Sequence, residues 1–342
     1  MAAMSIYDWS QIADIFQEGL VLGNGASIAI DTCFTYNELL TAARVEGLIT
    51  SELELVFHYL GTMDFELVLT MLWHAHHVNA ALQITDSVTT KAYESLRAAL
   101  IEIVRRHHVA YEVAEPHLPA IHAFLKRFKT VACLNYDLIP YWAIMLGNQQ
   151  YGTWFKDAFL NGVFHENWRR FRAAYNASGA TLVFYPHGNL ALVSDLDGTE
   201  QKISLTERVG PALLWIGGLL HEIVKQWKLG IVRPLFVAEG LSSQKVAAIS
   251  RSPYLRTVYD QILPELGDAV AVYGWAASDN DVHIAKQIVR GTSKLAFSVH
   301  RGLGDEGAQA YCLDVYTQMK KLRWNIEIWF YWADSPGVWL NP

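Results

Sequence analysis

Short runs of apolar, β-branched residues recur along the chain, separated by longer segments in which apolar positions follow a helical period. Runs of this kind predict strands buried on both faces, whereas the longer segments predict amphipathic helices. Their alternation predicts an α/β fold, a parallel sheet of about six to seven strands with helices on both faces. The predicted strands are GLVLGN (19–24), TVACLN (130–135), TLVFYPH (181–187), RPLFVAE (233–239), AVAVYGW (269–275), KLAFSVH (294–300) and NIEIWFY (325–331).

Most of these predicted strands end in a small or polar residue. In a Rossmann-like sheet, ligands bind outside the carboxyl ends of the strands, where the strand order reverses. The sequence therefore predicts a binding site among the residues at these ends, which are Asn24, Asn135, His187, Glu239 and Gly274.

The segments between the first strands are too long for single crossover helices. Residues 35–128 include DFELVLTMLWHAHHVNAALQI and YESLRAALIEIVRRHH, which predict a helical insertion. Residues 141–176 include WFKDAFLNGVFHENWRRFRAAY, which predicts a second helical insertion. No Pro/Gly/Ser-rich linker divides the chain, so we expect one domain over residues 1–342 with an enlarged helical subdomain.

Composition narrows the class of protein. Of the 342 residues, 52% are hydrophobic and 18% are charged, enough to bury a large core. The net charge of −7 makes a general nucleic-acid binder an unfavourable interpretation. The N-terminal residues lack the pattern of a signal peptide, and no apolar run reaches the length of a membrane span. With only three cysteines, we expect a reduced, cytoplasmic protein that does not contact a membrane.

The stretch LGNGAS follows the first predicted strand. Gly23 and Gly25 would let the backbone approach a pyrophosphate, while Ala26 and Ser27 would add N–H groups and a hydroxyl near a helix N-terminus. Ile28 stands where the usual dinucleotide fingerprint has its third glycine. A Gly-Asn-Gly sequence also suits any tight turn, and this structural alternative stays open.

Two further motifs follow later strands. In CLNYD, Asn135 could hold a ribose hydroxyl or a water, although Asn135 and Asp137 could equally cap the following helix. In YPHGN, His187 is a candidate general base, although a His-Gly pair also occurs in ordinary turns. We expect no metal site, because the HAHH stretch has no carboxylate at helical spacing and three cysteines cannot form a four-cysteine zinc site.

In this order and spacing, the motifs resemble those of the sirtuin-like (SIR2-like) family, whose sequences read Gly-Ala-Gly-Ala-Ser, Thr-Asn-Tyr-Asp and His-Gly. Asp64, Phe65 and Glu66 are similar to the Phe-Glu pair of an early family helix. AEGLSSQK (238–245) resembles the family's Gly-Thr-Ser nucleotide loop, and VYGWAASDND (272–281) resembles a loop of bacterial SIR2-like defence proteins. EGLSSQKVAAISRSPYL and YGWAASDNDVHI also look like the bacterial DUF4917 family.

The resemblance implies an NAD⁺ glycohydrolase that cleaves the nicotinamide–ribose bond to give nicotinamide and ADP-ribose. It implies catalytic roles for Asn135, His187 and Asp137, with His187 as the base. Without the zinc ribbon of the protein deacylases, deacylation is not expected. The residues expected to bind NAD⁺ are Gly23, Asn24, Gly25, Ala26, Ser27, Glu66, Gly240, Ser242, Gly274 and Asp281.

The resemblance further implies an antiphage defence effector that is a homo-oligomer and depends on a trigger or a defence-system partner protein. Two other functions remain open. One is a non-catalytic sensor or scaffold that binds NAD or ADP-ribose and recruits a partner. The other is a nucleoside-transferring enzyme that acts on a different nucleotide.

Overall fold

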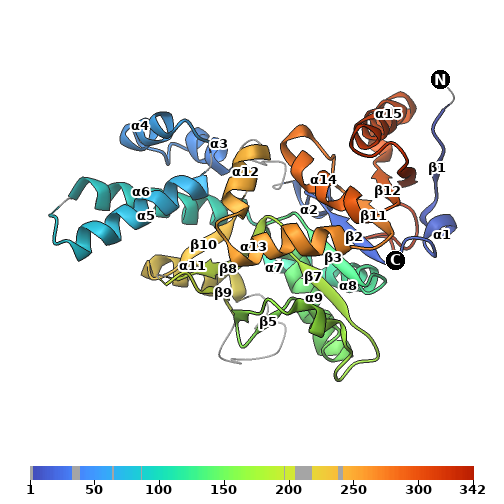
Figure 1. The fold of residues 1–342 in the computed structure, drawn as a ribbon, viewed down its shortest axis with the longest axis horizontal. Helices are drawn as coiled ribbons and strands as arrows, with labels where there is room; N and C mark the ends of the chain where they lie inside the picture. Colours follow the sequence, from blue (N-terminus) through green and yellow to red (C-terminus); the bar gives the residue numbers. More distant parts are fainter. Residues whose placement is uncertain are drawn as a thin grey trace.

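The computed structural model describes residues 3–32, 39–63, 65–85, 87–195, 197–204, 218–237 and 242–342, with Leu39 and Glu66 described by their backbone alone. The described residues form a parallel sheet of eight strands (Figure 1). Its spatial order is β1 (Ile6–Tyr7), β13 (Glu327–Trp332), β12 (Lys294–Val299), β11 (Ala269–Tyr273), β2 (Gly19–Leu22), β3 (Thr130–Cys133), β7 (Thr181–Phe184) and β4 (Phe155–Lys156).

The strand order is that of a doubly wound fold. From β2 the chain proceeds to β3 and β7 on one side, and then returns to β11, β12 and β13 on the other side. The order therefore reverses between β2 and β11, and this is the position where such sheets bind ligands. The predicted Rossmann-like α/β fold is confirmed, with β1 and β4 as additional short edge strands.

Helices cover both faces of this sheet, as the fully apolar strands require. Val270 and Val272 of β11 belong to one core cluster with α14 (Val282–Gly291) and α15 (Gly304–Leu322). Ala271 and Tyr273 belong to the opposite cluster, in which Tyr273 packs against Phe124 of α8 (Leu118–Leu125). Phe124 also contacts Trp9 of α1 (Trp9–Ile12). Alternate residues of one strand thus pack against different helical layers.

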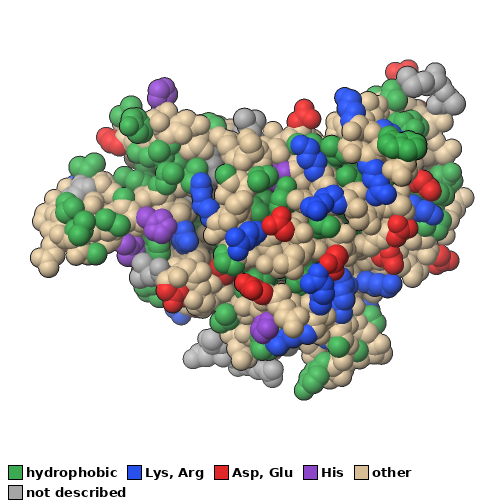
Figure 2. Space-filling view, in the orientation of Figure 1, with side chains coloured by type: hydrophobic (Ala, Val, Ile, Leu, Met, Phe, Trp, Pro, Cys, Tyr) green, Lys and Arg blue, Asp and Glu red, His purple; other side chains and the backbone are tan. Residues whose placement is uncertain are grey.

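The first insertion is helical where it is described. It projects from the sheet as an arm of α3–α6 (Figure 1), whose surface carries several hydrophobic side chains (Figure 2). Its helices α5 and α6 pack against each other. The elements between β2 and β3 are α2 (Gly25–Ile28), α3 (Leu39–Val45), α4 (Ser51–Leu60), α5 (Phe65–Ala81), α6 (Ser87–His107), α7 (Tyr111–Ala114), η2 (Glu115–His117) and α8.

The second insertion is α-helical only in its first part, α9 (Ile139–Tyr151). After β4 the chain forms a hairpin of β5 (Phe159–Leu160) and β6 (Val163–Phe164), then η3 (Trp168–Arg172). The hairpin turns at Asn161 and Gly162, whose φ angles are 53° and 81°. Two consecutive positive φ values suit an Asn-Gly turn and not a helix. The prediction of helix over residues 141–176 is therefore wrong beyond Tyr151, apart from the short 3₁₀ helix η3.

β5 and β6 belong to a second, antiparallel sheet with the order β10 (Arg233–Phe236), β8 (Gly188–Ser194), β9 (Glu200–Lys202), β6 and β5. The predicted strand RPLFVAE is β10 at the edge of this sheet, so its assignment to the parallel sheet is wrong. The remaining elements are α11 (Leu219–Leu229), α12 (Ser242–Ile249), α13 (Pro253–Thr257), η4 (Val258–Ile262), η5 (Leu263–Glu265), η6 (Asp279–Asp281) and η7 (Arg301–Leu303). Among the described residues, none of the helices has the length and apolarity needed to cross a membrane.

Candidate functional site

The Gly-Asn-Gly turn after β2 packs directly against the end of β11. The N–H of Gly23 donates to the carbonyl of Tyr273 (2.9 Å), and the N–H of Gly25 donates to the carbonyl of Gly274 (2.8 Å). Gly274 has a φ of +67°, and a Cβ there would lie 2.4 Å from the amide nitrogen of Ala26. The glycines are therefore required by the close approach of two loops at the point of strand reversal.

Three residues predicted for the site meet beside this turn. The amide nitrogen of Asn135 donates to the hydroxyl of Ser27 (2.8 Å), which donates to Oδ2 of Asp137 (2.5 Å). The N–H of Ile139 donates to Oδ1 of Asp137 (2.9 Å), so Asp137 also caps the start of α9. We call Ser27, Asn135 and Asp137 the β3 corner.

The carboxyl group of Asp137 is buried in the β3 corner, and among the described residues its hydrogen-bond partners are neutral. Burial raises the pKa of Asp137 from 3.8 to about 6, although the hydrogen bonds from Ser27 and Ile139 act in the opposite direction. Both donors are neutral, so they only partly offset the cost of removing the charge from water. At pH 7 the group is mostly ionised, with a pKa suited to accepting a proton.

Asn189 and Leu190, which follow His187 in the chain, form hydrogen bonds to the backbone at the β3 corner and so bring His187 close to it. The side chain of Asn189 donates to the carbonyl of Asp137 (2.8 Å), and the N–H of Leu190 donates to the carbonyl of Tyr136 (2.9 Å). Gly188, between His187 and Asn189, has a φ of +76°, and a Cβ there would lie 2.1 Å from the carbonyl oxygen of Leu235. The glycine after the histidine is therefore a steric requirement of this tight path.

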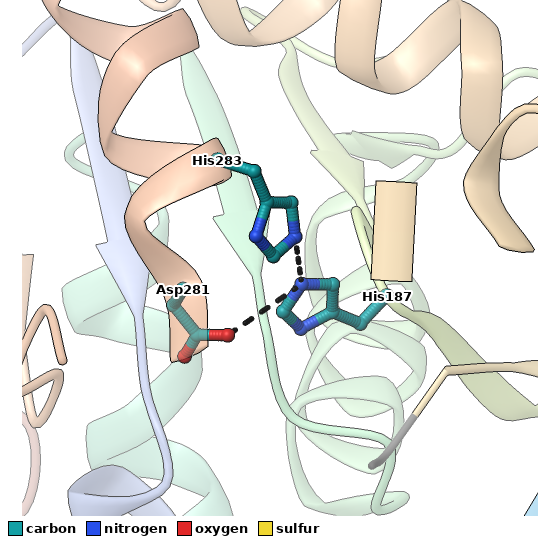
Figure 3. A group of neighbouring side chains, drawn as sticks. All are labelled: His187, Asp281 and His283. Carbon is teal, nitrogen blue, oxygen red and sulfur yellow. Dashed lines mark hydrogen bonds and ion pairs between the residues drawn. The ribbon is translucent and has the colours of Figure 1, made fainter. Parts of the chain in front are cut away.

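His187 belongs to a buried polar cluster with Asp281 and His283, which we call the histidine cluster. Figure 3 shows His187 pointing from the turn after β7 toward two residues at the start of α14. The Nε2 atoms of His187 and His283 are 3.1 Å apart, and Nε2 of His187 lies 3.9 Å from Oδ1 of Asp281. The hydroxyl of Ser242 lies 3.1 Å from Nδ1 of His283.

Both imidazoles of the histidine cluster are neutral at pH 7. Burial lowers the pKa of His187 to about 3 and that of His283 to about 4, against the opposing charge of Asp281. One ring must donate in the contact between the Nε2 atoms, and the nearby carboxylate favours the proton on His187. His283 then accepts at Nε2 and donates from Nδ1 to Ser242, leaving the lone pair of His187 on Nδ1.

Asp281 differs from Asp137 because it has a cationic partner. Nζ of Lys245 lies 2.9 Å from Oδ1 of Asp281, and the indole N–H of Trp275 lies 3.3 Å from Oδ2. Burial acts to raise the pKa of Asp281, but its basic neighbours His187 and Lys245 hold it below its ordinary value. Because His187 is neutral at pH 7, the Lys245 ammonium supplies the positive charge at that pH.

The ligand-type atoms of the histidine cluster all lie within 4.8 Å of one another, close enough to share a metal ion. The ammonium of Lys245 already neutralises the carboxylate of Asp281, and a divalent ion would have to compete with it. Hydrogen bonds and the ion pair of Lys245 with Asp281 therefore hold the histidine cluster together without a metal ion. That the protein binds no metal stays an expectation.

A comparison of the sequence with profiles of known protein families assigns the chain to one family. The profile described as "Domain of unknown function (DUF4917)" matches residues 20–339. The chain belongs to the DUF4917 family. The match begins in β2 and ends beyond β13, so the family domain includes the β3 corner and the histidine cluster. No curated protein matches the sequence significantly.

Some predicted residues of this DUF4917 domain cannot be placed. Gly240 and Glu239 lie outside the described residues, as do Asp64 and the side chain of Glu66. Asn24 is the residue that precedes α2, beside Gly25. Ser242, the first residue of α12, lies beside the histidine cluster through its contact with His283.

Three polar residues of the site were not predicted from the sequence. They are His283, Lys245 and Asn189. His283 stands two residues after Asp281 in DNDVHI, and a histidine so close to a predicted site residue is a usable signal. Lys245 had no comparable signal, because its role depends on α12 packing near α14.

Proposed function

We propose that this DUF4917 protein is a sirtuin-like NAD⁺ glycohydrolase that releases nicotinamide and ADP-ribose. The observation that carries the proposal is the β3 corner, in which a buried carboxylate and an amide meet beside the point of strand reversal. This is where doubly wound sheets place nucleotides. The resemblance of LGNGAS, LNYD and PHGN to sirtuin-like motifs supplies the substrate class.

The reaction requires a water to replace nicotinamide at C1′ of the ribose. The C–N electron pair leaves with nicotinamide, which departs neutral from its cationic form, and the water oxygen forms the new bond to C1′. The proton of the water passes to a base. A carboxylate near C1′ also stabilises the oxocarbenium-like transition state.

We assign the base role to Asp137 in preference to His187. With a pKa of about 6, Asp137 is mostly ionised at pH 7 and still accepts a proton effectively. His187, with a pKa of about 3, is a much weaker base in this state. In this proposal Asn135 orients the water or a ribose hydroxyl, and His187 contacts the substrate as a neutral hydrogen-bonding group.

The first prediction concerns turnover. Purified protein mixed with NAD⁺ should release nicotinamide, measured by chromatography. Asp137→Asn and Asn135→Ala should each reduce the rate by about 10²–10⁴-fold, the range typical of lost acid–base catalysis. The rate of the wild-type protein should rise with pH through about 6, because the ionised form of Asp137 is the active one.

Asp314→Asn is the matched control for this assay, because Asp314 lies on the exposed side of α15. A rate that is half-maximal near pH 3 would indicate His187 as the base. Full activity in both Asp137→Asn and Asn135→Ala would contradict the assignment of the β3 corner as the catalytic site.

A second candidate function is a sensor or scaffold that binds NAD or ADP-ribose without turnover. One observation favours it. Both carboxylate oxygens of Asp137 already accept hydrogen bonds, from the hydroxyl of Ser27 and from the N–H of Ile139, which makes the group less available as a base. Binding of NAD⁺ by calorimetry without nicotinamide release would support this second function over the first.

We also propose that the protein is a homo-oligomer that acts in defence with a trigger or partner protein. An apolar groove of about 500 Å³ lies between α4 and α5, and its side chains include Leu55 and Tyr59, which are 70% and 89% exposed. Exposed apolar surface of this kind is typical of protein interfaces.

The second prediction follows from this groove. In sedimentation velocity the wild-type protein should be larger than a monomer, and Leu55→Asp with Tyr59→Asp should shift it toward the monomer because charges are costly at an apolar interface. Wild-type protein that stays monomeric at all concentrations would contradict self-assembly.

A further inference from the structure

A second candidate ligand site lies in the helical part of the molecule. A cavity of about 680 Å³ opens between the end of α6, α7, α9 and α11. Its volume falls within the range of roughly 300–1,000 Å³ that is typical of small-molecule sites. Its apolar wall includes Leu220 and Val224 of α11 and the ring of Trp142 of α9.

Two polar groups in the wall of this cavity lack hydrogen bonds. The hydroxyl of Tyr111 and the indole N–H of Trp142 have no partner among the described residues, although both side chains are more than nine-tenths buried. The two rings meet edge to face, with centroids 5.2 Å apart. Buried donors without an acceptor are unfavourable, so a bound ligand with an acceptor group would satisfy them.

The charges around the cavity are mainly positive. Among the described residues, Arg105, Lys225 and Lys228 line it with a single carboxylate, Glu112. This local excess contrasts with the net charge of −7 on the whole chain. An anion is therefore the ligand that the cavity attracts.

His108 also lines the cavity but contributes no positive charge. Its Nε2 accepts the N–H of Leu138 (2.9 Å), and its Nδ1 lies 2.9 Å from the carbonyl of Val109, to which it donates. Burial lowers the pKa of His108 to about 4, so the ring is neutral at pH 7. The attraction of an anion thus depends on the lysines and the arginine.

Lys228 is the best cation on which to test this attraction. Arg105 and Lys225 also form ion pairs, with Glu102 and Glu222 at 3.8 and 3.3 Å. Lys228 lies in the last turn of α11, exposed at the cavity. Lys321 occupies the same position in the last turn of α15 and provides a matched control, because the helix-dipole effect of replacing it is the same.

We propose that this cavity binds an anionic ligand with a planar ring, of the size of a mononucleotide. The ring packs between Trp142, Tyr111 and the apolar side chains of α11, and the anionic group lies near Lys228. The buried hydroxyl and indole N–H donate to acceptors on the ligand. This site is separate from the β3 corner and does not depend on the proposed NAD⁺ hydrolysis.

The test uses adenosine 5′-monophosphate as the probe, measured by calorimetry on the full chain. Adenosine and inorganic phosphate are the two other arms, because each carries only one half of the proposed chemistry. The monophosphate should bind at least about tenfold more tightly than either arm. Lys228→Glu should weaken its binding by about tenfold or more, whereas Lys321→Glu should leave it unchanged.

The variant Tyr111→Phe provides a second test of the cavity. Removal of the unsatisfied hydroxyl should leave the thermal midpoint of the free protein unchanged or raise it, and should weaken binding of the monophosphate several-fold. Loss of binding in Lys228→Glu assigns the probe to this cavity, because Lys228 lines the cavity and is not part of the β3 corner. No binding of the probe, equal binding of phosphate alone, or binding unaffected by both cavity variants would overturn the proposal.

Discussion

Asp137, which is buried, and Asp281, which is partly buried, lie at the same edge of one sheet, and their carboxyl groups have opposite pKa shifts. Asp137 is surrounded by neutral donors, and burial raises its pKa to about 6. Asp281 is held below its ordinary pKa, although burial acts on it in the same direction as on Asp137. The difference is made by two basic neighbours of Asp281, which are His187 at 3.9 Å and the ammonium of Lys245 at 2.9 Å. Burial alone therefore does not decide the charge state of a carboxyl group, because basic neighbours can reverse the shift.

The two aspartates suit different tasks. A carboxylate with a raised pKa exchanges a proton near neutral pH, which is useful for chemistry. A carboxylate paired with a lysine stays ionised and stabilises the position of its neighbours. Asp281 thereby places His283 and the N-terminus of α14 beside His187.

The largest change in the free energy of unfolding is expected when Lys245, the cationic partner of Asp281, is replaced. Lys245→Met should leave the Asp281 carboxylate without its partner and reduce the free energy of unfolding at pH 7 by about 3–5 kcal/mol, the cost of breaking a buried ion pair. The side chains of Lys245 and Asp281 are only 8% and 19% exposed, so solvent screens the pair weakly. Urea denaturation measures the change.

The control for this change is Lys286→Met, which replaces an exposed lysine of α14. Adding Asp281→Leu to Lys245→Met should recover part of the lost stability, because the unpaired charge is then absent. A loss below about 1 kcal/mol for Lys245→Met would mean that the pair behaves as an exposed salt bridge.

Replacing Asp137 is expected to change the free energy of unfolding in the opposite direction. The folded protein binds a proton at Asp137 between about pH 4 and pH 6, where the unfolded chain has lost it, so ionisation costs the folded state free energy above pH 6. Asp137→Asn removes this cost and should raise the free energy of unfolding at pH 8 by about 1–3 kcal/mol. The gain should disappear near pH 4, as measured by urea denaturation at both pH values.

Asp314→Asn is again the control and should show no such dependence on pH. Asp137→Asn, although more stable at pH 8, should hydrolyse NAD⁺ about 10²–10⁴-fold more slowly than wild type, which separates loss of function from loss of folding. Equal stability of Asp137→Asn and wild type at pH 8 would contradict the pKa assigned to Asp137.

A smaller effect on stability is expected when the buried histidine His187 is replaced. The pKa values of His108, His187 and His283 are lowered from 6.5 to about 4, 3 and 4. Below pH 6.5 the unfolded chain takes up protons that the folded protein does not, so stability is lost as the pH falls toward 4. His187→Gln should reduce the loss between pH 6 and pH 5 by about 1 kcal/mol.

His58→Gln, at an exposed position of α4, is the control for this histidine effect. Thermal unfolding followed at several pH values provides the measurement. An unchanged slope in His187→Gln would show that His187 takes up a proton in the folded state as readily as in the unfolded chain.

Much of the fold could be predicted because strands buried on both faces leave a strong apolar signal. β2, β3, β7, β11, β12 and β13 coincide with apolar runs in the sequence. β10 has a similar composition but is half-exposed and contains Pro234, which has no N–H to donate. Such a strand is suited to a sheet edge, so its antiparallel partner was decided by packing and not by composition.

The segment after α9 was mispredicted for a related reason. Its aromatic residues recur at helical spacing, but they also fit the short strands β5 and β6. Asn161 and Gly162 carried the signal for a hairpin, and their positive φ values are incompatible with a continuing helix. The preference of Asn161 and Gly162 for a tight turn therefore decided the structure of this segment, and the helical spacing of its aromatic residues did not.

The sequence by itself determined the strands, their polar ends and the glycines that let two loops approach closely, because these depend on local sterics and burial. It also carried the motifs that bring Ser27, Asn135 and Asp137 together. The tertiary structure alone decided which carboxylate has a cation, since Lys245 reaches Asp281 from a different helix. It also decided that His187 lies against His283, because charge states depend on neighbours that are distant along the chain.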